Sequence, residues 1–85
     1  MIARTYELTP HDGRKSFYGK AQVVEAGPVR ILFSYCTPVA YIDAAGTFHR
    51  TWGGWSATTG RHVVAFGGPG KAAWDKLPVE PVPNY

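Results

Sequence analysis

Ten glycines and seven prolines divide this 85-residue chain into short segments, and this division limits what the chain can fold into. Between the breaks lie stretches rich in aromatic and β-branched residues, which are typical of strands. The segments that we expect to form strands are residues 17–25, 29–36, 39–43 and 47–52. A short helix is expected over 71–77, where Pro78 would stop it. The sequence therefore predicts an α+β fold, with a mainly antiparallel sheet of about four strands and one or two short C-terminal helices.

Apolar residues on both faces of segment 29–36 indicate a strand at the centre of the sheet. The alternation of a strand places Ile31, Phe33 and Tyr35 on one face, opposite Arg30, Leu32, Ser34 and Cys36. Proline cannot donate a hydrogen bond to a neighbouring strand, so we expect Thr37-Pro38 to interrupt the pairing.

A hairpin should follow, because residues 44–46 form a short loop that contains glycine. If the ends of this loop pair, Asp43 faces Thr47, Ile42 faces Phe48, and Tyr41 faces His49. The face assigned to the core then carries Ala40, Ile42, Phe48 and Trp52, and the wetter face carries Val39, Tyr41, Asp43, Thr47, His49 and Thr51. We expect Arg50 at the edge of the apolar face, with its stem buried and its charged head in water.

The domain organisation follows from the length and from the last residues. The length suits a single globular domain, residues 1–77, followed by a proline-rich tail, residues 78–85. We expect the tail to be extended, and mobile unless it docks. The N-terminus lacks the apolar stretch of a signal peptide, and no segment suits a membrane span, so we expect a cytoplasmic protein without a membrane partner.

A polar box lies between Trp55 and Phe66 and contains five residues of interest, namely Ser56, Thr58, Thr59, Arg61 and His62. The serine and threonines are good N-cap residues for a helix that starts near Thr59. Gly60 and the valine pair that follows the box disfavour a helix, and the same residues alternate as a strand would. Local propensity therefore does not decide whether this segment forms a helix or a strand.

Two interpretations of this box are open. A helix N-terminus, together with the guanidinium of Arg61, could bind a phosphate or a carboxylate. Alternatively, the hydroxyl groups cap the helix, while Arg61 and His62 tie it to the sheet. We favour the structural interpretation.

The sequence gives little evidence for a catalytic site or a metal site. Cys36, His49 and Asp43 could suggest a catalytic triad, but the direction of Cys36 beyond the proline is unknown. A single cysteine allows no intramolecular disulfide and no cysteine-rich zinc site, and the spacing of His11, His49 and His62 matches no common metal site. We therefore expect no enzymatic activity, no cofactor and no metal.

Aromatic residues interleaved with basic ones suggest a binding surface. The candidate partner-binding residues are Arg14, Lys15, Tyr18, Lys20, Tyr41, His49 and Arg50. The formal net charge of +3 suits a nucleic acid as well as an acidic protein surface. Exposed aromatic side chains can stack on unpaired bases, or they can anchor a protein partner.

The stretch from residue 35 to residue 77 resembles a largely uncharacterised family of small proteins from phages and other mobile elements. The motifs that carry the resemblance are Thr37-Pro38-Val39-Ala40-Tyr41, Ser56-Ala57-Thr58-Thr59-Gly60-Arg61-His62, Phe66, and Trp74-Asp75-Lys76-Leu77-Pro78-Val79. The resemblance implies that the box opens a helix. It also implies a stoichiometric inhibitor of host defence in the bacterial cytoplasm, of the anti-CRISPR type, with a type I surveillance complex (Cascade) as partner. The alternative is a small nucleic-acid-binding accessory protein of a phage or plasmid.

Overall fold

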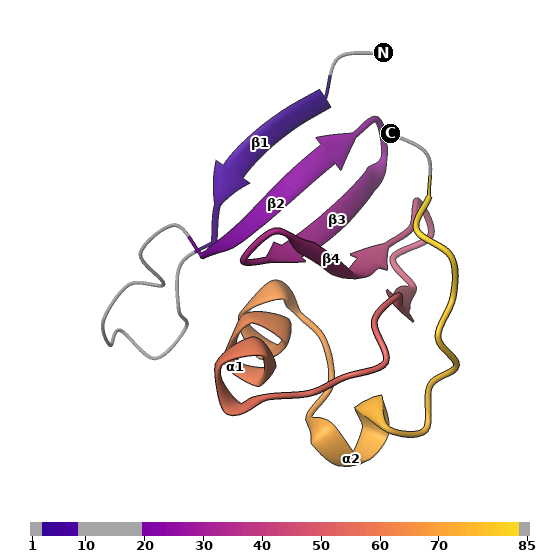
Figure 1. The fold of residues 1–85 in the computed structure, drawn as a ribbon. Helices are drawn as coiled ribbons and strands as arrows, with labels where there is room; N and C mark the ends of the chain where they lie inside the picture. The colour runs from indigo at the N-terminus through magenta and orange to yellow at the C-terminus, as the bar shows by residue number, and fades with distance from the viewer. Residues whose placement is uncertain (1–2, 9–19, 84–85) are drawn as a thin grey trace.

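Each strand of the sheet pairs antiparallel with the strand that follows it in the chain (Figure 1). The computed structural model describes residues 3–8 and 20–83. Its elements are β1 (Ala3–Glu7), β2 (Ala21–Ala26), β3 (Val29–Ser34), β4 (Thr37–Ile42), β5 (Phe48–Arg50), α1 (Ala57–Phe66) and α2 (Lys71–Trp74). The predicted α+β class, with an antiparallel sheet and short C-terminal helices, is confirmed, and β3 is the central strand as predicted. No helix in the described part is long and apolar enough to cross a membrane.

The sheet has five strands rather than about four, because β1, which was not predicted, lies at one edge. β1 pairs with β2 from Ala3 opposite Ala26 to Glu7 opposite Gln22. β2 begins at Ala21, later than predicted, and residues 17–19 of the predicted strand lie outside the described residues.

The connection between β3 and β4 differs most from prediction. β3 ends at Ser34, and Tyr35 has a positive φ of 62°, so the chain turns here instead of continuing to Cys36. The expected interruption at Pro38 was wrong, because Pro38 lies within β4 and pairs with Phe33. The register shifts between Leu32 and Phe33, which accommodates the proline as a bulge does.

The same register shift explains why Val39 is buried. Leu32 pairs with Ala40 while Phe33 pairs with Pro38, so Val39 is an extra residue on β4. It was predicted on the wetter face, yet it is only 1% exposed and belongs to the core.

The β4–β5 hairpin has the predicted register, with Tyr41 opposite His49 and Ile42 opposite Phe48. The loop is closed by a hydrogen bond from the backbone N–H of Asp43 to the carbonyl of Thr47. β5 itself covers only Phe48–Arg50 and is shorter than the predicted segment 47–52.

α1 is a helix, as the resemblance implied. Ser56 is the N-cap, and its Oγ accepts a hydrogen bond of 3.1 Å from the backbone N–H of Thr59. Gly67 ends the helix in the left-handed conformation that glycine favours. Gly60, which disfavours a helix by propensity, is buried under Trp55, and a Cβ there would overlap the indole. α2 covers Lys71–Trp74 only, shorter than the predicted 71–77.

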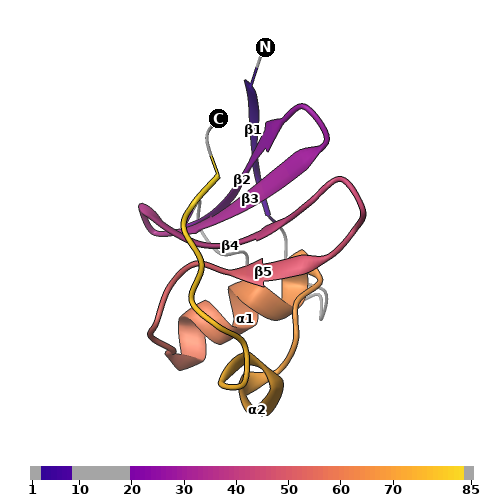
Figure 2. The same ribbon diagram turned by 90° about the vertical axis from the view of Figure 1, so that its right-hand side faces the viewer.

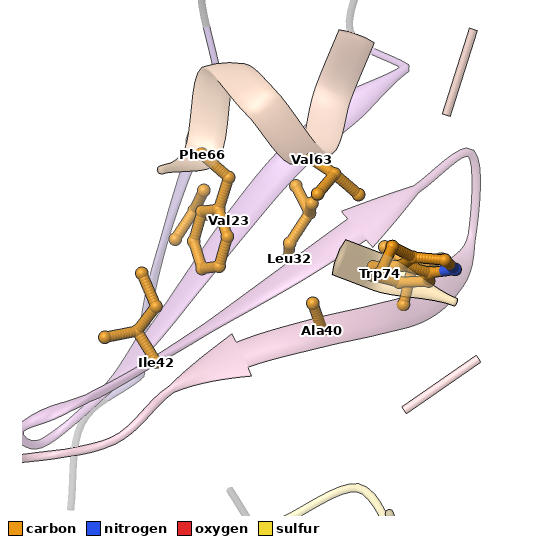
Figure 3. Close-up of a cluster of buried hydrophobic side chains, with 8 residues drawn as sticks. Val23, Leu32, Ala40, Ile42, Val63, Phe66 and Trp74 are labelled. Carbon is orange, nitrogen blue, oxygen red and sulfur yellow. The ribbon is translucent and has the colours of Figure 1, made fainter. Parts of the chain in front are cut away.

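The core lies between the sheet and the helices (Figure 3). Val63 and Phe66 of α1 point toward side chains of β2, β3 and β4, and Trp74 of α2 closes the cluster. The buried residues of the cluster are Val23, Leu32, Val39, Ala40, Ile42, Val63, Phe66 and Trp74. Burying each large apolar side chain contributes about 1.5–3 kcal/mol, so the core fixes both helices on one face of the sheet.

The segment after α2 is extended, as predicted, and runs beside β5 (Figure 2). Val79 forms a parallel bridge with Arg50, and the backbone N–H of Glu80 donates to the carbonyl of Arg50 at 2.8 Å. The tail therefore contacts the edge of the sheet through these residues.

Candidate functional site

The polar box forms a buried link between α1 and β3. The Oγ of Ser34 lies 2.8 Å from His62 Nδ1 and 3.1 Å from Thr59 Oγ1, within hydrogen-bond distance of both. All three residues are buried. Thr59 and His62 therefore tie the helix to the central strand, while Ser56 caps it.

The electrostatics of the box agree with a structural role. Burial lowers the pKa of His62 below its ordinary value, and the nearby positive charge of Arg61 lowers it further. The imidazole is therefore neutral at neutral pH. Thr58 and Arg61 are exposed on the outer side of α1.

Arg50 is not a surface residue, and the expectation that its charged head lies in water was wrong. It is only 8% exposed, and its guanidinium donates to four backbone carbonyls. These carbonyls belong to Trp52, Gly53, Trp74 and Leu77. The loop after β5 and the α2 region bring these acceptors around the side chain, so Arg50 is unavailable to a partner.

Tyr41 and His49 form a polar cluster on the face of the sheet opposite the helices. Their rings stack, with centroids 4.4 Å apart and an interplanar angle of 13°. His49 Nε2 lies 2.7 Å from Asp43 Oδ2, and its Nδ1 lies 2.8 Å from Glu80 Oε2. The imidazole is thus held between two carboxylates, one from the hairpin loop and one from the tail.

This arrangement shifts the pKa values of three ionisable groups. The hydrogen bonds to Asp43 and then Glu80 raise the pKa of His49 above its ordinary value. The hydrogen bond from His49, followed by the backbone bond from Thr47, lowers the pKa of Asp43. Burial, and then the negative charges of Glu80 and Asp43, raise the pKa of Tyr41. Both imidazole nitrogens are engaged in the cluster, and protonation of His49 makes it an imidazolium paired with two carboxylates.

The triad of Cys36, His49 and Asp43 is not assembled. Asp43 and His49 are in contact, but Cys36 precedes the start of β4, while Asp43 follows its end. The strand separates the thiol from the imidazole. Within residues 3–8 and 20–83, no group of three His, Cys, Asp or Glu side chains could hold a metal ion.

A second surface lies at the other end of β4, and we call it the Tyr35 corner. It consists of Thr5, Lys20, Gln22, Val24, Phe33, Tyr35 and Cys36. All of these except Lys20 line a shallow groove on the sheet, and Lys20 places its Nζ 5.6 Å from the centre of the Tyr35 ring. Tyr35 is 53% exposed, which makes it a prominent aromatic residue of this surface.

Tyr35 is held in place through its backbone and through its ring. Its N–H donates to the carbonyl of Lys20 at 2.6 Å, and its ring lies tilted against His62, with centroids 6.1 Å apart. The Tyr35 corner therefore rests on the same buried link that fixes α1.

The sequence identified only part of this surface. Lys20 was a candidate, whereas Tyr35 and Cys36 were assigned to a strand, because no glycine or asparagine marks the turn between β3 and β4. The candidates Arg14, Lys15 and Tyr18 lie outside the described residues. Of the remaining candidates, Tyr41 and His49 are only partly exposed and bind each other.

Comparison with known proteins gives a family match. The profile described as "Family of unknown function (DUF8033)" matches residues 6–76, from the end of β1 through α2. No curated protein and no solved structure matches the chain.

Proposed function

The chain belongs to DUF8033, a family of unknown function, and we propose that it is a small binding protein that occupies a partner's surface and catalyses no reaction. In this proposal it acts stoichiometrically, and the Tyr35 corner is the contact surface. The rest of the domain holds that corner in one conformation.

The conformation of Tyr35 carries this proposal. A bulky residue with φ of 62° is strained by about 1–3 kcal/mol, and such strain is found where a surface performs a function. The strained residue is also exposed, next to a groove that contains Val24 and Phe33. Exposed tyrosines beside apolar grooves are typical anchors of protein interfaces.

The distribution of charge favours a protein partner over a nucleic acid. The charge of Arg50 is buried, while Arg4 and Lys71 are paired with Glu25 and Asp75. The groove at the corner is lined by neutral residues, so phosphate groups would find few cations there. A neutral, partly aromatic groove suits an apolar side chain of a protein.

The narrower part of the proposal concerns the identity of the partner. The resemblance to phage and mobile-element proteins supports an inhibitor of host defence in the bacterial cytoplasm, of the anti-CRISPR type. A chain with a net charge of +3 is a poor mimic of DNA, which is densely negative. It would instead cover a protein surface of a type I surveillance complex (Cascade) that recruits target DNA or the nuclease.

One experiment tests the activity and the stoichiometry together. Purified type I surveillance complex is mixed with labelled target DNA and increasing amounts of the chain, and DNA binding and nuclease recruitment are measured. We expect inhibition that saturates at a fixed molar ratio, with no shift of DNA by the chain alone. Inhibition by far less than one chain per complex would indicate catalysis and contradict the proposal.

A second candidate function rests on the contact between Lys20 and Tyr35. A cation beside an exposed aromatic ring can bind a phosphate while the ring stacks on an unpaired base. If the chain alone binds single-stranded DNA, and the affinity falls steeply as salt rises, it is a nucleic-acid-binding accessory protein instead.

A further inference from the structure

The C-terminal segment covers the free side of β5, and two kinds of contact hold it there. Val79 bridges to Arg50, and the N–H of Glu80 donates to the carbonyl of Arg50. The side chain of Glu80 reaches His49 on the same strand. Figure 2 shows this segment, in yellow, rising from α2 past β5.

The contact between His49 and Glu80 joins residues that are 31 positions apart. It is an ion pair between the sheet and the C-terminal segment. The imidazole of His49 has neighbours from β4, from the hairpin loop and from the tail. Tyr41 of β4 stacks on the imidazole, Asp43 of the hairpin loop binds Nε2, and Glu80 of the tail binds Nδ1. Arg50, the next residue of β5, points to the opposite face and is enclosed by carbonyls.

Asp43 is held rigidly, so that the imidazole has a fixed partner on one side. The Oδ1 of Asp43 accepts hydrogen bonds from the backbone N–H groups of Ala45 and Thr47, at 2.9 Å and 3.0 Å. Its Oδ2 is left for His49. Glu80, in contrast, is the partner carried by the tail.

We propose that residues 79–83 form a pH-sensitive strap over the edge of β5, and that the imidazole of His49 is the latch that holds it closed. When protonated, His49 donates to both carboxylates at once. When neutral, it has a single N–H, and its second nitrogen presents a lone pair to a carboxylate oxygen. One of the two hydrogen bonds is then lost, and two negative charges face each other across an uncharged ring.

The sign of the effect follows from this geometry. The pKa of His49 is raised, so its contribution to closing the strap is complete below about pH 6.5 and disappears as the pH rises through the raised value. The ordered carboxylate Asp43 keeps its bond to the imidazole, so Glu80 is the partner that leaves. Opening would uncover the carbonyl of Arg50 and present the edge of β5 to another strand.

Hydrogen exchange of single amides tests the strap. The protection factor of the Glu80 amide, corrected for intrinsic exchange, is measured by NMR from about pH 5.5 to about pH 9. The amide of Thr51, which donates to the carbonyl of Val39 in the hairpin, is the internal reference. We expect the protection of Glu80 to fall about fivefold to tenfold across the titration of His49, while that of Thr51 stays constant.

Two variants separate the latch from general loosening. Glu80→Gln keeps an acceptor for His49 but removes the charge, so protection of this amide should be lower at acid pH and independent of pH. Asp75→Asn removes a carboxylate that pairs with Lys71 on α2, away from His49, and should behave like the wild type. Constant Glu80 protection in the wild type, an equal fall at Thr51, or an unchanged pH response in Glu80→Gln would each overturn the strap.

Discussion

The guanidinium of Arg50 lies 4.9 Å from the centre of the Trp74 indole and donates to the carbonyl of Trp74 at 3.0 Å. One side chain of β5 thus contacts both the ring and the backbone of a residue in α2. Trp74 is fully buried, and its own Nε1 donates to the carbonyl of Gly54. These contacts join the last strand, the loop after it and the second helix into one unit.

Replacement of Arg50 by lysine should destabilise the fold, although the charge is kept. A lysine ammonium is a compact donor and cannot reach the carbonyls that the guanidinium spans, so buried acceptors lose their partners. We expect the free energy of unfolding to fall by about 2–4 kcal/mol, measured by urea denaturation. Arg4→Lys is the matched control, because Arg4 is 75% exposed in its pair with Glu25 and should change stability by less than about 1 kcal/mol. Equal effects of the two substitutions would contradict the role assigned to Arg50.

Gly60→Ala should be destabilising, opposite to what helix propensity predicts. Alanine at an ordinary helical position gains about 1 kcal/mol over glycine, but here the new Cβ would overlap the indole of Trp55. Displacing that ring disturbs its packing on Trp74, where the ring centroids are 5.5 Å apart. We expect a net loss of about 1–3 kcal/mol in thermal or urea unfolding.

Gly70→Ala is the control for that substitution. Gly70 has an ordinary φ of −74°, and no heavy atom lies within 4 Å of the position of its Cβ. The stability of the Gly70→Ala variant should stay within about 0.5 kcal/mol of the wild type. If Gly60→Ala were the more stable of the two, Trp55 would not be packed on α1 as described.

The two histidines should make stability depend on pH in separate ranges. His62 is buried and its pKa is lowered, so at mildly acidic pH this histidine binds a proton in the unfolded chain and stays neutral in the folded chain. Stability should therefore fall as the pH drops below about 6.5. His49 has a raised pKa, so its contribution is complete below that value and is lost on the alkaline side.

Urea denaturation across this pH range checks both effects. His62→Gln should flatten the acid side of the stability profile, while His49→Gln should flatten the alkaline side. A wild-type profile that is level below about pH 6.5 would show that His62 is protonated in the folded state.

Tyr35→Gly should be more stable than Tyr35→Ala, although glycine is the more flexible residue. Glycine adopts φ of 62° without strain, whereas alanine keeps the strain and loses the ring. We expect a difference of about 1 kcal/mol in favour of glycine, measured by urea denaturation. The reverse order would mean that Tyr35 does not adopt the left-handed conformation in solution.

The hairpin between Tyr41 and His49 was predictable because its signals are local. A glycine-containing loop fixes the turn, and the alternation of the flanking residues fixes the register. The start of α1 was less predictable. Ser56, Thr58 and Thr59 were all candidate caps for a helix expected to start near Thr59, whereas the helix begins at Ala57 with Ser56 as its N-cap, and local propensity did not decide between helix and strand.

The surfaces were less predictable because distant segments build them. Nothing near Arg50 in the sequence indicates that carbonyls of α2 will surround it, and the partner of His49 in the tail lies 31 positions away. The Tyr35 corner combines residues of β1, β2 and β3 with a turn that lacks the usual turn residues. Its main feature, a positive φ at a tyrosine, has no counterpart in local propensity.

Whether the Tyr35 corner is the contact surface is tested most directly by affinity capture with matched variants. Tagged wild type, Tyr35→Gly and Tyr6→Ala are incubated with lysate of the bacterial host, with and without DNase treatment, and the captured proteins are quantified by mass spectrometry. Tyr6 is the control, since it is 36% exposed and also carries a cation, Arg4, over its ring. We predict the same partner with the wild type and Tyr6→Ala, and at least about tenfold less of it with Tyr35→Gly. Equal recovery with Tyr35→Gly, or loss of the partner on DNase treatment, would contradict the account.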